Sequence, residues 1–299
     1  HRVLMNVVRN LTSDRVTLEH RHPHLNVITD NYEAAIQTQD AKEFPIIPSI
    51  TSQAQTIRIA GEDFAAALAN VAVAVQYSDI RPEISGIFFN YANEQLTLAG
   101  TDSFRLAERV LRHPAIAATT ASAAAIVPIK TVHELLKIFG SRGETVEVSI
   151  DANQALFKTE ATQVISRLID GAFPDYQSII PKSVQGEVIA NRQELVSAVK
   201  LISSFSGKAN DITLRIGDTK KFVELYAANA SIGENRYRVP AKVTGDRFTA
   251  VFNWRYLLDG LRIFQTEEIS IGVNAPDRPV VLRSSREPQL TYVVMPIKG

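Results

Sequence analysis

The chain has 299 residues, of which 45% are apolar and 21% charged, a composition typical of an ordinary globular protein of about two domains. Lys plus Arg and Asp plus Glu each number 32, so the net charge is zero and overall basicity gives no argument for nucleic-acid binding. The absence of cysteine excludes disulfides and thiolate metal sites, and it fits a reducing, cytoplasmic location.

The first predicted element is a helix over Arg2–Leu11. Because the chain opens with His1 and without a signal peptide, we expect a fragment that begins inside a domain. The next segment carries His20, His22 and His24, whose alternation on a strand would place them on one face, as in a metal site. The repeat described below aligns them with hairpin tips, so we predict a solvated turn with no metal and no other cofactor.

The chain repeats one plan three times: an amphipathic helix, a turn, several strands and then an apolar-Pro pair. Pro45, Pro174 and Pro296 close the three copies at intervals of about 125 residues. This pattern predicts an α+β fold of tandem units, each with strands and two helices. The first copy lacks the segment that precedes the amphipathic helix in the other two, so we interpret it as half a unit.

A second helix is predicted before the amphipathic helix of the later copies, within IAGEDFAAALANVAVAV and IANRQELVSAVKLISSF. In the first of these, Phe64, Leu68, Val71 and Val75 share one helical face. The same run contains Asn70 and is too short to cross a bilayer, so we expect no membrane partner. Pro- and Ser-rich stretches separate the units. The predicted domains are residues 1–53, the C-terminal half of a unit, then 54–182 and 183–299.

Positive residues recur a heptad apart on the amphipathic helix of each copy. Seven residues make two helical turns, so the members of each pair share one face. One such pair is usually only a solvated surface, but three equivalent pairs predict spaced positive charge that suits a phosphate backbone bound without regard to base sequence. The predicted DNA-binding residues are Arg2 and Arg9, Lys130 and Lys137, and Arg255 and Arg262.

Motifs of common enzymes are absent, since there is no phosphate-binding GxxxxGK[ST], no HExxH and no GxSxG. Asp170 and Asp175 neighbour Gly171 and Pro174, so we expect them to serve turns instead of a two-metal site. The sequence therefore predicts no catalytic residues. Two alternatives stay open: a DNA-modifying enzyme of an unrecognised type, and a repeat scaffold that never contacts nucleic acid.

Three segments resemble those of one protein family. GTDSFRLA at Gly100–Ala107 is similar to the ATDxxRLA segment of bacterial beta sliding clamps. RLIDGAFPDYQSIIP at Arg167–Pro181 resembles their LVDGxFPDYxxVLP, and TYVVMPIK at Thr291–Lys298 resembles their terminal YVVMPMR. The three segments occur in the family's order, and the resemblance covers the whole chain.

The resemblance implies tandem repeats of the DNA clamp fold, in which two chains join head to tail into a ring around duplex DNA. The implied function is that of a processivity factor, a non-catalytic subunit of the DNA polymerase III holoenzyme that works in the cytoplasm at the nucleoid. The implied partners are double-stranded DNA, the polymerase III alpha subunit, the clamp loader, other proteins with the clamp-binding peptide motif, and a second copy of the chain as a homodimer.

The resemblance also implies a hydrophobic pocket between the second and third domains, which receives a short peptide motif of these partners. Aliphatic and Met walls with a few polar groups suit such a site. The pocket residues by motif position are Ile84, Thr101, Ser103, Phe104, Arg105, Leu106, Pro174, Ile179, Tyr256, Val293, Val294, Met295, Pro296 and Ile297. Leu106 and Val294 fit a hydrophobic core almost as well.

The chain departs from the family pattern at both ends and inside the first motif. Phe104 stands where His or Arg is frequent, so we expect a more apolar pocket wall there. Lys298 and Gly299 end the chain, where a terminal residue of the family often helps to close the pocket. With only half of the first unit present, ring closure by this chain stays an open question.

Overall fold

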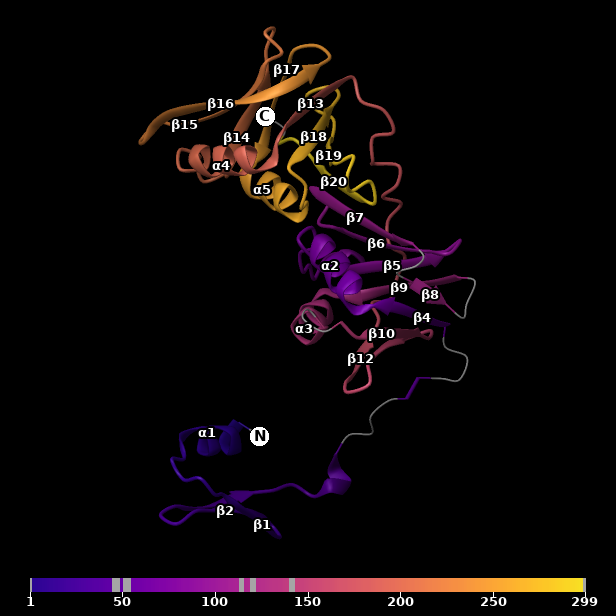
Figure 1. The fold of residues 1–299 in the computed structure, drawn as a ribbon, viewed down its shortest axis with the longest axis vertical. Helices are drawn as coiled ribbons and strands as arrows, with labels where there is room; N and C mark the ends of the chain where they lie inside the picture. Colours follow the sequence, from indigo (N-terminus) through magenta and orange to yellow (C-terminus); the bar gives the residue numbers. More distant parts are fainter. Residues whose placement is uncertain are drawn as a thin grey trace. The chain divides into compact units, whose positions relative to one another are not determined.

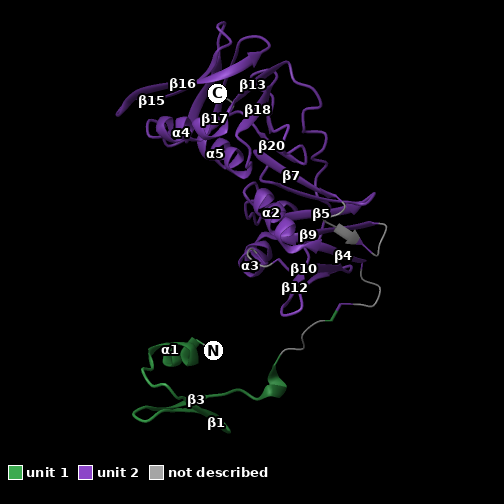
Figure 2. Ribbon diagram, in the orientation of Figure 1, with its two compact units in different colours: residues 1–49 green, residues 50–299 purple. Residues whose placement is uncertain are grey.

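The computed structural model describes residues 2–44, 49–50, 55–112, 116–118, 122–139 and 143–297. Pro45, which closes the first predicted repeat, and the terminal Lys298 and Gly299 lie outside the described residues. The chain divides into two compact units, His1–Ser49 and Ile50–Gly299, which are green and purple in Figure 2.

The first unit consists of one helix and a three-stranded sheet. Helix α1 spans Arg2–Asn10, which confirms the predicted first helix. Strands β1 (Thr17–Arg21), β2 (His24–Ile28) and β3 (Glu33–Gln37) form an antiparallel meander, followed by the 3-10 helix η1 (Ala41–Glu43). His22 lies in the tight turn between β1 and β2, so the predicted hairpin turn is confirmed.

The second unit contains two copies of one arrangement, called here the central repeat (residues 55–167) and the last repeat (residues 186–294). The elements of the central repeat are β4 (Gln55–Ala60), α2 (Gly61–Ala72), η2 (Pro82–Ile84), β5 (Gly86–Ala92), β6 (Gln95–Thr101), β7 (Arg105–Arg112), β8 (Ile116–Ala118), β9 (Ser122–Pro128), α3 (Ile129–Phe139), β10 (Thr145–Ile150), β11 (Gln154–Lys158) and β12 (Gln163–Arg167). Those of the last repeat are β13 (Gly186–Asn191), α4 (Arg192–Ser203), β14 (Asp211–Ile216), β15 (Phe222–Asn229), β16 (Gly233–Thr244), β17 (Phe248–Asn253), α5 (Trp254–Ile263), β18 (Glu268–Val273), β19 (Val280–Arg283) and β20 (Leu290–Val294).

Strand order shows the repetition directly. The central repeat has the order β12-β11-β10-β4-β8 in one sheet and β7-β6-β5-β9 in another, and the last repeat has β20-β19-β18-β13-β16 followed by β15-β14-β17. The long strand β16 takes the place of both β7 and β8, because residues 233–240 pair with β15 and residues 241–244 pair with β13. The predicted tandem α+β architecture is therefore confirmed.

The two repeats are joined edge to edge. Strand β7 pairs antiparallel with β20, from Arg105 opposite Val294 to Arg109 opposite Leu290. Backbone pairing continues past the strand end, where the amide of Met295 donates to the carbonyl of Phe104 at 2.8 Å. One 12-stranded sheet thus crosses the junction in the described part of the chain.

Helices α2, α3, α4 and α5 lie on one side of the second unit, as Figure 1 shows. Helix α2 contacts α3, and α4 contacts α5. The side-chain amide of Asn70 on α2 donates to the carbonyl of Ile263, the last residue of α5, at 3.0 Å. The helices therefore form a row in the order α3, α2, α5 and α4.

Both helices of the last repeat begin with an asparagine cap. The side chain of Asn191 accepts a hydrogen bond from the backbone amide of Glu194 at 3.0 Å, and that of Asn253 accepts one from Arg255 at 2.9 Å. Each cap satisfies an amide that has no partner inside the helix. These caps fix where α4 and α5 start, and so they fix the positions of the cations on α5.

Aromatic side chains and one glycine hold the helices of the central repeat against its sheets. The rings of Phe64, Phe89 and Phe157 lie 6.1 to 6.3 Å apart between α2 and the strands. A Cβ atom at Gly100 would lie 2.5 Å from the side chain of Val75. A glycine at position 100 of β6 therefore lets the end of α2 and the residues up to Val75 pack closely against this strand. Gly100 lies just before the turn between β6 and β7.

Candidate functional site

A cavity of about 810 Å³ opens beside the junction of β7 and β20. Its apolar wall includes Leu106, Tyr176 and Val293, which are all buried in one small hydrophobic cluster. Polar groups complete the lining, so the cavity combines apolar surface with a few oriented polar groups, as binding sites for small ligands and peptides do. Eight of the predicted pocket residues line it: Thr101, Ser103, Arg105, Leu106, Pro174, Ile179, Val293 and Met295.

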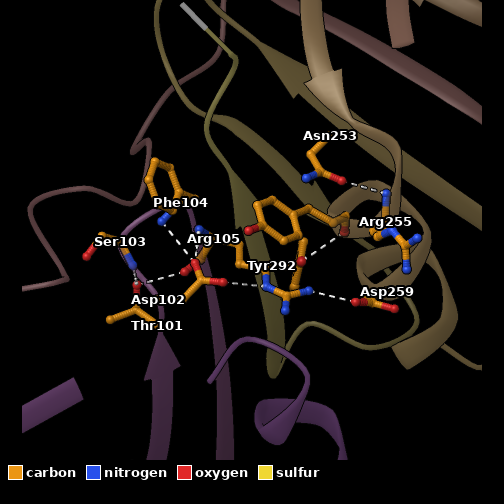
Figure 3. A network of polar contacts seen from close by, with 10 residues as sticks. Thr101, Asp102, Ser103, Phe104, Arg105, Asn253, Arg255, Asp259 and Tyr292 are labelled. Carbon is orange, nitrogen blue, oxygen red and sulfur yellow. Dashed lines mark hydrogen bonds and ion pairs between the residues drawn. The ribbon is translucent and has the colours of Figure 1, made fainter. Parts of the chain in front are cut away.

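The turn between β6 and β7 is organised by the Thr-Asp-x-x-Arg part of the first motif (Figure 3). The Thr101 hydroxyl accepts from the amide of Ser103 at 3.1 Å and donates to the carbonyl of Arg105 at 2.7 Å. One carboxylate oxygen of Asp102 accepts from the amides of both Phe104 and Arg105 at 3.0 Å. Asp102 was not among the predicted site residues, although its place in the motif could have indicated this role.

Arg105 connects the turn between β6 and β7 to helix α5 on the other side of the junction. Its Nε atom lies 2.9 Å from the Asp102 carboxylate, and its Nη1 atom lies 2.6 Å from Asp259 on α5. Its guanidinium also lies over the Tyr256 ring, with 4.3 Å between Cζ and the ring centroid. The Tyr292 hydroxyl donates to the carbonyl of Tyr256 at 2.8 Å, so strand β20 holds the same turn of α5. Sequence reasoning missed Asp259, which lies 154 residues from Arg105.

Burial and charge together set the ionisation of this region. Burial opposes the charge of Arg105, but the carboxylates of Asp259 and Asp102 favour it, and the net effect raises the pKa of the guanidinium above its ordinary value. Burial also raises the pKa of the Tyr292 hydroxyl. Burial and the nearby Glu108 carboxylate raise the pKa of Tyr176 in the cavity wall. At neutral pH the guanidinium is therefore charged and both phenols are neutral.

Six predicted pocket residues lie outside the cavity lining, and the alternation of a strand explains one of them. Val293 faces the cavity, whereas Val294 belongs to the large hydrophobic core on the opposite face of β20. Successive side chains of a strand point to opposite faces, so both cannot line one pocket. Pro296 is buried just past the strand, and the amide of Ile297 donates to the carbonyl of Val251 at 2.7 Å, which ties the terminal segment to β17.

The other three lie on helices or on the exposed turn. Ile84 is buried in η2, within the interior of the central repeat. Tyr256 is held beneath the Arg105 guanidinium. Phe104 contributes its backbone to the junction, but its ring is 60% exposed and outside the lining, so it does not form the more apolar wall that was expected.

All six predicted DNA-binding residues are exposed. Lys130 and Lys137 lie on α3, where Lys137 pairs with Glu134 at 2.7 Å and Lys130 lies 4.9 Å from the centroid of the Tyr77 ring. Arg255 and Arg262 both lie on α5, which is one of the two middle helices of the row. The guanidinium of Arg255 also donates to the side-chain oxygen of Asn210 at 3.3 Å. Arg2 and Arg9 lie on α1 of the first unit.

Repeats of two helices on antiparallel sheet, joined edge to edge with the helices in one row, are the architecture of a sliding clamp. The comparisons with known proteins agree. Residues 58–175 match the family model for the DNA polymerase III beta subunit, central domain, and residues 177–298 match that for its C-terminal domain. The chain therefore belongs to the DNA polymerase III beta subunit family.

Individual relatives cover nearly the whole chain. The beta sliding clamp of Synechococcus elongatus is 28% identical over 302 residues, which are 99% of this chain and 80% of that protein. The beta sliding clamp of Bacillus subtilis is 26% identical over 300 residues, 99% of this chain and 79% of the relative. The crystal structure of the DNA polymerase sliding clamp from Bacillus subtilis matches with a TM-score of 0.92 at 25% identity, over 100% of this chain and 78% of that one.

The described residues contain no cluster of three or more His, Asp or Glu side chains placed to hold a metal ion. Within the same residues, no helix has the length and apolar character that a membrane span requires.

Proposed function

We propose that this chain is a processivity factor of DNA polymerase III, a non-catalytic subunit that surrounds duplex DNA and holds the polymerase on it. The observation that carries this proposal is the row of four helices on one side of a continuous sheet, with exposed cations on α3 and α5. Helices backed by sheet form a stiff wall, and spaced cations on it attract phosphates without reading bases. Retention by a closed ring does not require tight binding, so the ring can slide.

The cavity at the junction is proposed to bind a short peptide motif of the partner proteins. Its support is the apolar wall of Leu106, Tyr176, Val293 and Met295 beside the ordered turn that ends at Arg105. The polymerase III alpha subunit and the clamp loader are the partners proposed for it, together with other proteins that carry the motif. Because such partners act on the bacterial chromosome, we place the chain in the cytoplasm at the nucleoid.

Fluorescence anisotropy with a labelled peptide tests the cavity. The peptide contains Gln, a spacer and then Leu-Phe, and it is titrated with the chain and with Met295→Ala. We expect saturable micromolar binding that weakens several-fold in Met295→Ala, because the variant removes apolar contact from the cavity wall. A well-folded chain that binds no peptide would contradict the proposed pocket.

The internal junction also supports a head-to-tail homodimer. By the repeat, residues 233–239 of β16 correspond to β7, and β3 corresponds to β20. Within the described residues, neither edge has a strand partner. We propose that β3 of one copy pairs with β16 of another as β20 pairs with β7. The same register sets Glu33 opposite Arg236 and Ala34 opposite Asn235.

The lack of cysteine makes this register easy to test. Ala34→Cys and Asn235→Cys in one chain should form cross-linked dimers under mild oxidation, because directly opposed Cβ atoms lie about 5 Å apart in an antiparallel pair. Each single variant serves as a control and should cross-link poorly. Equal cross-linking by Ala34→Cys with a displaced partner, Asn229→Cys, would contradict the register.

A further inference from the structure

We infer that the cavity selects peptides whose apolar anchor is flanked by acidic side chains, and that Lys182 and Arg278 bind those carboxylates. The inference rests on the proposed peptide-binding function of the same cavity and adds the chemistry of the ligand. Four cations line the cavity, Arg81, Arg105, Lys182 and Arg278, and no Asp or Glu is found among the described residues of its lining.

Two of these cations are already neutralised within the protein. Arg105 lies between two carboxylates, as described above. Arg81 pairs with Glu83 at 3.0 Å and donates to the Ser103 hydroxyl at 2.9 Å. Both guanidiniums therefore have their charge compensated before any ligand arrives.

The other two cations are free to meet a ligand. Lys182 and Arg278 are both exposed, and neither forms an ion pair with another residue in the described part of the chain. They come from the segment that joins the two repeats and from the turn between β18 and β19, so they approach the cavity from two separate stretches of chain. An uncompensated pair of cations beside an apolar wall favours an anionic ligand that also has an apolar part.

Hydrogen bonds hold these two stretches together. The side chain of Asn274 accepts from the amide of Gln185 at 3.0 Å and donates to the carbonyl of Ser183 at 3.3 Å. The Arg283 guanidinium donates to the carbonyl of Pro181 at 3.2 Å. The backbone amide of Arg278 donates to the carbonyl of Ala275 at 2.9 Å, within the turn between β18 and β19. The backbone that carries Lys182 and Arg278 is therefore fixed before a ligand binds, which lowers the ordering cost of binding.

The lining of the cavity brings together separate parts of the chain. Its apolar wall includes Leu106 of β7 and Val293 of β20, and its two free cations belong to the segments 178–185 and 274–279. An extended chain advances about 3.3 Å per residue, so a peptide anchored at the apolar wall places its flanking residues beside the cations within a few positions. Carboxylates at those positions gain attraction that depends on salt concentration.

The experiment compares three labelled peptides that share the Gln-spacer-Leu-Phe anchor and differ in two flanking residues, which are both Glu, both Gln or both Lys. One set of peptides carries the flanking residues before the anchor, and a second set carries them after it. The readout is the ratio of dissociation constants between the Gln and Glu forms at low and high salt. For one placement we expect the Glu form to bind about threefold to tenfold more tightly at low salt, with the gain reduced at high salt.

Two variants identify the residues responsible. In Lys182→Gln with Arg278→Gln, the ratio should fall to about one, and in Lys182→Glu with Arg278→Glu the Lys form should become the preferred ligand. The matched control replaces Lys158 and Lys208 by Gln, since both are exposed and lie outside the cavity lining. This control should keep the original ratio.

The outcomes separate the inference from the function on which it rests. If the neutral peptide binds but neither placement of Glu improves binding, the inference is wrong and the peptide pocket stands. If a single-stranded oligonucleotide displaces the peptide while Glu gives no gain, the two cations serve phosphates and the inference is again wrong. If no peptide binds at all, the proposed pocket itself fails.

Discussion

The guanidinium of Arg105 lies 2.6 Å from the carboxylate of Asp259. The first residue lines the cavity from β7 of the central repeat, and the second lies on α5 of the last repeat between the cations Arg255 and Arg262. One ion pair thus connects the cavity wall, the junction of the repeats and the helix proposed to face DNA. The pair is only partly exposed, at 11% for the Arg105 side chain and 35% for Asp259, so it is screened less than a surface pair.

Breaking this ion pair should destabilise the second unit. Asp259→Asn leaves Arg105 with one carboxylate in place of two, and we expect the free energy of unfolding to fall by about 1–2 kcal/mol. Urea denaturation followed by circular dichroism measures this change. Asp277→Asn, an exposed residue of the same repeat, is the matched control and should change stability by less than about 0.5 kcal/mol. Equal stabilities of the two variants would show that the pair contributes little.

A Cβ atom at residue 260 should disturb the contact of α5 with the sheet. It would lie 2.4 Å from the ring of Tyr292, which is fully buried and cannot move into solvent. Gly260→Ala is therefore expected to cost about 1–3 kcal/mol, measured as a lower midpoint of thermal unfolding, although alanine favours a helix. Gly217→Ala, where no atom lies within 4 Å of the added Cβ, is the control. A variant at position 260 as stable as this control contradicts the close contact.

The free energy of unfolding should fall at alkaline pH, because the buried Tyr176 and Tyr292 resist ionisation in the folded chain. The folded-state pKa of Tyr176 and of Tyr292 is raised above the ordinary value of 10.0, mainly by burial. Their contribution is complete below pH 10 and is lost as pH rises above it, because only the unfolded chain then releases these protons easily. The free energy of unfolding should fall by up to about 1.4 kcal/mol per pH unit for each tyrosine.

Tyr176→Phe separates this effect from other alkaline changes. The Phe variant lacks the ionisable hydroxyl, so its unfolding free energy should decrease less steeply between about pH 10 and pH 11 than that of the parent chain. Tyr32→Phe is the control, since Tyr32 is exposed and its variant should keep the parent slope. Identical slopes for the Tyr176 variant and the parent chain would sink this explanation.

Charge reversal on α5 should weaken DNA binding without regard to sequence. Arg255→Glu with Arg262→Glu removes two exposed cations from the helix row, and the slope of log affinity against log salt should decrease in magnitude by about 2. Anisotropy of a labelled duplex at several salt concentrations measures the slope. Lys158→Glu with Lys242→Glu changes charge equally on strands β11 and β16, and it should have a smaller effect. Equal losses in both double variants would indicate only a net-charge effect.

The sequence alone determined the repeat, the α+β class and the positions of the helices. These features rest on short-range chemistry: helical periodicity from Phe64 to Val71, a hairpin turn at His22, and motif residues such as Thr101 that bond within their own turn. The three motif segments were also sufficient to indicate the family, which the family models then showed. Each of these signals lies within a few neighbouring residues or repeats along the chain.

Only the tertiary structure decided how the cavity is built. Val293 and Val294 are neighbours of the same type, but the pleat sends one to the cavity and the other to the core, and the strand's register was needed to tell which. The pairing of Arg105 with Asp259, and the convergence of Lys182 with Arg278, join residues that no local pattern links. Long-range contacts depend on strand pairing across the junction, so the motifs identified eight of the lining residues but not Tyr176, Lys182 or Arg278.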